Sequence, residues 1–125
     1  MHRLSASFVL GYHGCEASVA ERLLKNQPFT PSQNTWDWLG SGIYFWEANP
    51  ERGLEFASEV AARKGKKVKY PAVIGAVIDL GFCLDLTTSA GLQETRDAFL
   101  DLQKISQGAG VPLPENRADG RHNLD

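Results

Sequence analysis

The spacing of apolar positions predicts three strands separated by helices. Residues 7–14 form a mostly apolar run that ends in glycine, which predicts a strand that stops at Gly14. Residues 43–46 read Ile-Tyr-Phe-Trp and predict a short, half-buried strand after a glycine-containing loop. Residues 72–80 are nearly continuous in apolar side chains, so this segment is predicted as the strongest strand, with both of its faces buried.

Three other segments carry apolar positions at helical spacing. Residues 15–26 have an apolar stripe with charged residues outside it, and so predict a helix. Asn49 is a good N-cap before Pro50, which predicts a helix that continues to about residue 64. A third, amphipathic helix is expected over about residues 90–107, capped by a residue in the Thr-Thr-Ser run at 87–89.

Together these elements predict an α+β fold. A chain of 125 residues is one domain by the length prior. We expect the domain to span residues 1–110, because residues 111–125 are polar and lack any period and therefore predict an irregular tail.

Composition and charge narrow the function. The net charge of −2 argues against a protein that coats nucleic acid, because no strong positive field is implied. The basic run at residues 63–69 is expected to be a solvated turn, with a phosphate or nucleic-acid contact as the alternative. No apolar run approaches the length of a membrane span, so no membrane association is expected. Two distant cysteines without a secretion signal predict a reducing, cytoplasmic location.

The candidate chemistry lies in polar and aromatic residues near glycines. Three histidines without ligand spacing and two isolated cysteines predict no metal site. His13 and Cys15 lie two positions apart, but no third group is evident to orient the histidine, so a cysteine nucleophile is not favoured. Residues 36–46 combine aromatic rings with a glycine loop, a composition suited to a flat polar ligand or to a plain hairpin entering a core strand. Residues 27–34, rich in proline, could act as a lid or as a simple connector.

Two motifs change this picture. Tyr12-His13-Gly14 and Gly40-Ser41-Gly42-Ile43-Tyr44-Phe45 resemble the first two motifs of the ADP-ribosyltransferase superfamily, in the branch of the poly(ADP-ribose) polymerases and diphtheria toxin. That family has a His-Gly pair at the end of its first core strand and then a Gly-x-Gly-(Ile/Val)-Tyr-Phe stretch before a helix. The resemblance covers about residues 5–90 and implies a split β-sheet core with flanking helices, here lacking its last strands.

The resemblance also implies roles for individual residues, with NAD as the substrate. His13 would bond the ribose hydroxyl on the nicotinamide half of NAD, and Tyr44 would stack on the nicotinamide ring; these two are the expected catalytic positions. Gly14 would meet the nicotinamide amide with its backbone N–H and C=O, and Gly42 would let the backbone approach the ligand. Phe56 would supply a second stacking aromatic, displaced by about one residue from the family position.

The third family motif, a glutamate on a later strand, has no match in the chain. Glu94 falls in a predicted helix, Glu115 in the irregular tail, and Glu47 directly after the second motif. Three functions therefore remain open. The chain would be part of an NAD-dependent mono-ADP-ribosyltransferase that modifies a protein or nucleic acid and releases nicotinamide, an NAD glycohydrolase, or a non-catalytic binding module. A toxin-like protein of the first kind would be expected to have an antitoxin or immunity partner.

Overall fold

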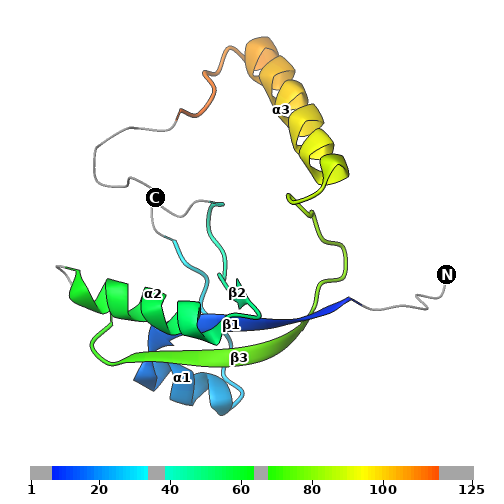
Figure 1. Ribbon diagram of the computed structural model, residues 1–125. Coiled ribbons are helices and arrows are strands. Elements are labelled where there is room, and N and C mark those ends of the chain that lie inside the picture. Colours follow the sequence, from blue (N-terminus) through cyan, green and yellow to red (C-terminus); the bar gives the residue numbers. More distant parts are fainter. Residues whose placement is uncertain (1–6, 34–38, 64–67, 116–125) are drawn as a thin grey trace. The chain divides into compact units, whose positions relative to one another are not determined.

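The computed structural model describes residues 7–33, 39–63 and 68–115. The chain divides into two compact units, residues 1–81 and 82–125, which are described separately. The described part of the first unit contains a three-stranded antiparallel sheet and two helices, and that of the second contains one long helix (Figure 1).

The sheet has the strand order β2-β1-β3, so the first strand of the chain lies in the middle. Its strands are β1 (Phe8–Glu16), β2 (Trp46–Glu47) and β3 (Pro71–Asp79). β1 pairs with β3 over its whole length, from Phe8 opposite Asp79 to Glu16 opposite Pro71. β2 pairs with β1 only at Gly11 and Tyr12. Of the strand expected at residues 43–46, only Trp46 pairs with β1. The residues before Trp46 approach β1 through side-chain contacts.

β1 does not stop at Gly14, so that prediction is wrong. Gly14 pairs with Val73, and the strand continues two residues further before α1 (Ala17–Leu24) begins. The glycine is instead required by the helix above it, α2 (Pro50–Ala62). A Cβ atom on Gly14 would lie 2.1 Å from the carbonyl oxygen of Gly53 and 3.2 Å from the Cβ of Ala57. Gly14 therefore marks a close approach between strand and helix backbones.

The start of α2 agrees with the prediction. The side chain of Asn49 accepts a hydrogen bond from the backbone N–H of Arg52 at 3.0 Å, as an N-cap does, and Pro50 occupies the first turn. Ala57 is buried against the sheet, with 1% of its surface exposed. The helix is assigned to Ala62, and its predicted end near residue 64 lies outside the described residues.

The two faces of the sheet carry different residues. Tyr12, Val73 and Trp46 lie on the face under α2, because each has an atom within 3.6 Å of the position that a Cβ on Gly53 would take. Alternation along β1 directs His13 to the opposite face. Figure 1 shows α2 along one side of the sheet and α1 on the other. β3 is less buried than predicted: Val77 is 70% exposed, so this strand is not covered on both faces.

The second unit is built on α3 (Ser89–Ala109), which matches the predicted amphipathic helix. Thr88 caps its start by accepting the N–H of Gly91 at 3.1 Å, and Gly110 ends it with a left-handed backbone at φ 66°. The chain then turns back, with the N–H of Val111 donating to the carbonyl of Ser106 at 3.0 Å. Residues 111–115 have no regular structure, as expected, and the rest of the predicted tail lies outside the described residues.

Candidate functional site

His13 lies near the end of β1 within a group of three aromatic rings. Its ring centroid is 5.5 Å from that of Phe29, in an edge arrangement, and 5.6 Å from that of Phe45. The rings of Phe29 and Phe45 are 5.3 Å apart. We call His13, Phe29 and Phe45 the aromatic cluster. Its three members come from a strand, a loop and the segment before β2, so the cluster joins distant parts of the chain to one face of the sheet.

A hydrogen bond joins the two sequence motifs at this point. His13 Nδ1 lies 2.8 Å from the backbone carbonyl oxygen of Tyr44. A carbonyl oxygen can only accept, so Nδ1 carries the proton and donates it. In a neutral imidazole the other nitrogen, Nε2, is then an acceptor. The arrangement therefore sets which ring nitrogen of His13 can receive a hydrogen bond from a ligand.

The side chain of Tyr44 closes the loop that precedes it. Its hydroxyl donates to the carbonyl oxygen of Gly40 and accepts the backbone N–H of Leu39 at 3.2 Å. Tyr44 remains 37% exposed. The phenol end of the ring is thus fixed by the loop backbone, while part of the residue is accessible to solvent.

A backbone bridge connects the proline-rich loop to the second motif. The N–H of Ser32 donates to the carbonyl of Gly42 at 2.6 Å, and the N–H of Gly42 donates to the carbonyl of Ser32 at 3.2 Å. Gly42 was predicted to let the backbone meet a ligand, but its N–H is already engaged within the protein. The same bridge anchors the loop that carries Phe29 over His13.

The backbone of Gly14 faces the edge of β1 away from β3. Antiparallel pairing directs alternate residues to opposite edges. The N–H of Ala17 donates to the carbonyl of Tyr70 at 2.8 Å on the β3 side, whereas the carbonyl of Leu10 accepts from Ala48 at 2.7 Å on the β2 side. Gly14 is an even number of residues from Leu10, so its N–H and C=O point to the same edge, the β2 side. β2 pairs with β1 only as far as Tyr12, and Gly14 lies beyond that residue. Within the described residues these two groups have no ladder partner.

Phe56 is not brought to this site. Its ring packs on Trp46, with centroids 6.1 Å apart, and the guanidinium carbon of Arg52 lies 4.5 Å from the centroid of the same indole. Trp46 belongs to the sheet face under α2, opposite that of His13. The expected role of Phe56 as a second stacking aromatic beside His13 is therefore not supported by its position.

Cys15 shares a sheet face with His13 but is poorly suited to act as a nucleophile. The residue is 6% exposed, and burial raises the pKa of its thiol above the usual value of 9.0. A protonated thiol is a weak nucleophile. Burial of the thiol therefore does not favour a role for Cys15 as a nucleophile.

Among the described residues, no carboxylate forms a hydrogen bond or an ion pair with His13. Glu94 lies in α3, Glu115 in the irregular segment that follows it, and Glu47 on β2 opposite Gly11. Within the described ranges, no three potential ligands among His, Cys, Asp and Glu lie close enough to hold a metal ion. The aromatic motif residues at 36–38 lie outside the described part of the chain.

Glu16, three positions beyond His13, fixes the start of β3. Its Oε2 accepts the backbone N–H of Tyr70 at 2.9 Å and that of Lys69 as well. These two hydrogen bonds lower the pKa of the Glu16 carboxyl, and the bond from Tyr70 has the larger effect. The charged carboxylate therefore holds the entry of β3 against the end of β1.

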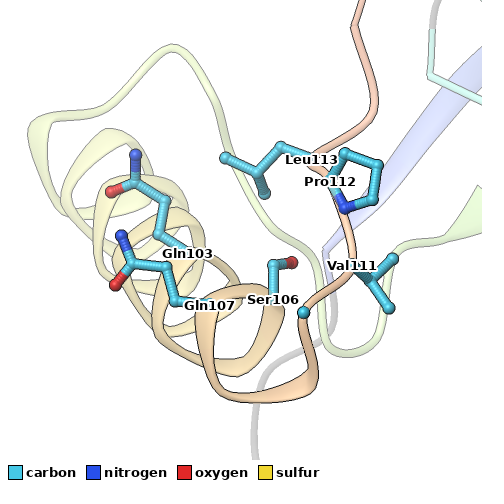
Figure 2. A pocket seen from close by; sticks show the side chains of 7 residues that line it. Gln103, Ser106, Gln107, Val111, Pro112 and Leu113 are labelled. Carbon is cyan, nitrogen blue, oxygen red and sulfur yellow. The ribbon is translucent and has the colours of Figure 1, made fainter.

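Two shallow cavities are lined by residues other than those of the aromatic cluster. One of about 410 Å³ is at the end of α3, where the returning chain places Val111, Pro112 and Leu113 near Gln103 and Gln107 (Figure 2). The other, of about 650 Å³, runs along the acidic side of α2. Neither is lined by His13 or Tyr44, and no charged side chain lines the first.

Neither Phe29 nor the role of Phe45 was predicted from the sequence. Phe45 lies within the second motif, and its alternation with Trp46 could have placed it on the His13 face. Phe29 lies in an aperiodic loop between two prolines, and no local pattern indicates which strand such a loop covers.

Comparisons with known proteins assign no family. No family model and no solved structure matches the chain. A stretch of 36 residues is 44% identical to uncharacterized protein MJ0359 of Methanocaldococcus jannaschii, covering 29% of this chain and 17% of that protein. The chain thus matches well under two thirds of that relative's length, and the relative's name states no activity. In the described residues, no helix has the length and apolar character needed to cross a membrane.

Proposed function

We propose that this chain is the NAD-binding part of an ADP-ribosyltransferase-like domain, which transfers ADP-ribose from NAD to a macromolecular acceptor and releases nicotinamide. The observation that carries the proposal is the hydrogen bond from His13 Nδ1 to the carbonyl of Tyr44 at 2.8 Å. The histidine of the first motif and the tyrosine of the second come from distant parts of the chain. Their contact supports a shared ligand site.

The hydrogen-bonding groups and the aromatic ring at this site suit NAD as a ligand. With Nδ1 donating to the Tyr44 carbonyl, the neutral form of the His13 ring would present Nε2 as an acceptor, which suits a ribose hydroxyl. The backbone N–H and C=O of Gly14 point to the open edge of β1, where they could pair with the carboxamide of nicotinamide. Tyr44 is 37% exposed, and its ring could stack on the pyridine ring. Fixing both the ring and the ribose would hold the glycosidic bond in position for attack.

A non-catalytic binding module is the second candidate. Breaking the bond between nicotinamide and ribose develops positive charge, which a fixed carboxylate would stabilise. Among the described residues no carboxylate is hydrogen-bonded or ion-paired to His13, an observation that favours binding without turnover by this stretch alone. Under the transferase or glycohydrolase proposal, that carboxylate comes from another part of the protein.

Labelled NAD tests these alternatives. The full-length protein is incubated with NAD labelled in the adenylate, in the presence of cell lysate. Label on protein or nucleic acid supports the transferase, and free labelled ADP-ribose supports the glycohydrolase. NAD that binds but stays intact supports the module. Absence of NAD binding to the full-length protein would refute the proposal as a whole.

A further inference from the structure

Tyr44 of the second motif is bonded both to its own loop and to His13 of the first motif. The hydroxyl of Tyr44 holds both the carbonyl of Gly40 and the N–H of Leu39, at the start of the loop that ends at Tyr44 itself. The carbonyl of Tyr44 accepts the Nδ1 proton of His13. The side chain and the backbone of Tyr44 therefore act on different partners at the same time.

We infer that Tyr44 is a positioning residue for His13, in addition to offering its ring to a ligand. Its hydroxyl fixes the loop at residues 39–44, and the loop holds the Tyr44 carbonyl where it selects the Nδ1–H tautomer of His13. The Nε2 atom is thereby presented as an acceptor. We call this arrangement the Tyr44 clasp. The hydroxyl acts on His13 without touching it.

The clasp narrows the kind of ligand group that His13 receives. An acceptor nitrogen pairs with a hydrogen-bond donor such as a hydroxyl, and it repels a phosphate or a carboxylate. The identity of the ligand group, a ribose hydroxyl of NAD, rests on the proposed function. The clasp itself is a property of the protein and can be measured without any ligand.

Tyr44→Phe tests the clasp because it removes the hydroxyl and keeps the ring. Tyr70→Phe is the matched control, since Tyr70 is exposed and lies directly before β3, outside the loop at residues 39–44. Two signals are measured by NMR on the whole 125-residue chain: hydrogen exchange of the Leu39 amide, and the ¹⁵N shifts of the His13 ring, which distinguish its tautomers. A purely structural role for Tyr44 would not move the second signal in a folded protein.

In Tyr44→Phe we expect the Leu39 amide to exchange about fivefold faster, the factor typical of one lost hydrogen bond. The His13 ring should change from mainly Nδ1–H to a mixture of tautomers. Tyr70→Phe should match the wild type in both signals. Exchange within twofold of wild type and an unchanged tautomer in Tyr44→Phe would overturn the clasp. If the variant proves unfolded, the wild-type spectrum still decides, because a His13 ring protonated mainly at Nε2 would contradict it.

Titration with NAD separates the clasp from the proposed function. If Tyr44→Phe shifts the tautomer and binds NAD several-fold more weakly than wild type, both are supported. A shifted tautomer with no NAD binding by either protein would support the clasp and count against the proposed function. Equal NAD binding with an unshifted tautomer would support the site and reject the clasp.

Discussion

The imidazole Nδ1 of His13 and the carbonyl oxygen of Tyr44 lie 2.8 Å apart although 31 positions separate the two residues in the chain. The contact is possible because His13 lies on the sheet face opposite α2, and the segment before β2 crosses that face. It fixes the ring of the histidine and leaves one nitrogen for a ligand.

Two substitutions of His13 separate its bond to Tyr44 from its proposed contact with the ligand. The side-chain nitrogen of asparagine reaches about the position of Nδ1, and the end of a glutamine side chain reaches about that of Nε2. We expect His13→Asn to keep the bond to Tyr44 and to bind NAD roughly two- to tenfold more weakly, the range for one hydrogen bond. His13→Gln should keep an acceptor for the ligand but show faster amide exchange in the loop at residues 39–44.

The two variants are compared by NAD titration and by hydrogen exchange on the same samples. Wild-type NAD affinity in both variants would show that His13 does not contact the ligand. Loop exchange that is equally slow in both would show that its bond to Tyr44 does not stabilise the loop.

Gly14 is expected to tolerate no side chain. A Cβ at this position would lie 2.1 Å from the backbone oxygen of Gly53, and neither backbone can move without disturbing the packing of α2 on the sheet. We expect Gly14→Ala to lower the free energy of unfolding by about 2 kcal/mol or more, as overpacked sites do. Urea denaturation measures this change.

Gly42→Ala is the control for Gly14. A Cβ on Gly42 meets nothing within 4 Å in the described structure, and the backbone there does not have a positive φ. The free energy of unfolding should change by less than about 1 kcal/mol in this variant. Equal effects of the two substitutions would contradict the proposed packing of β1 under α2.

Gly14 shows which features of the fold could not be predicted from the sequence. A glycine at the end of an apolar run predicts a strand end, yet Gly14 continues the strand because a helix backbone from residue 53 lies against it. That contact is tertiary and leaves no local signal. The cap at Asn49 and the end of α3 at Gly110 were predictable, since each depends on neighbouring residues only.

The candidate site was predictable in part for the same reason. The two motifs mark His13 and Tyr44 by their local order in the sequence, and the structure brings them into contact. The role of Phe56 was implied by the family resemblance, but α2 directs this residue toward Trp46 on the other face. Phe29 could not be assigned, because the path of a loop with two prolines is decided by the bridge between Ser32 and Gly42.

Glu16 should make the first unit sensitive to acid. Its pKa is lowered in the folded chain by the N–H groups of Tyr70 and Lys69. A lowered pKa means that the carboxylate stabilises the fold above its unfolded pKa, near 4.5, and that this contribution is lost as the pH falls through the folded pKa. We expect Glu16→Gln to destabilise the chain at pH 7 and to have little further effect in acid.

Stability curves between pH 7 and pH 3 measure this difference. Glu21→Gln, which changes an exposed carboxylate on α1, serves as the control and should follow the wild type. A Glu16→Gln curve parallel to that of the wild type across the whole range would show that the two backbone bonds contribute nothing to the pH dependence.

The cap of α2 should contribute measurably to the first unit. Asn49 accepts the N–H of Arg52, and without it this donor has no side-chain partner. We expect Asn49→Ala to lower the free energy of unfolding by about 1 kcal/mol, and Asn49→Asp to stay close to wild type, because aspartate caps equally well. Thermal unfolding followed by circular dichroism distinguishes them. Identical melting of the alanine and aspartate variants would rule out a stabilising cap.

The proposed site requires that a nicotinamide nucleotide contacts His13 and Tyr44 together. The most direct measurement is an NMR titration of the 125-residue chain with NAD, following the His13 ring and the Tyr44 ring in one experiment. Both rings should shift together and saturate at the same NAD concentration. Shifts confined to other residues, or none at millimolar NAD, would contradict the account.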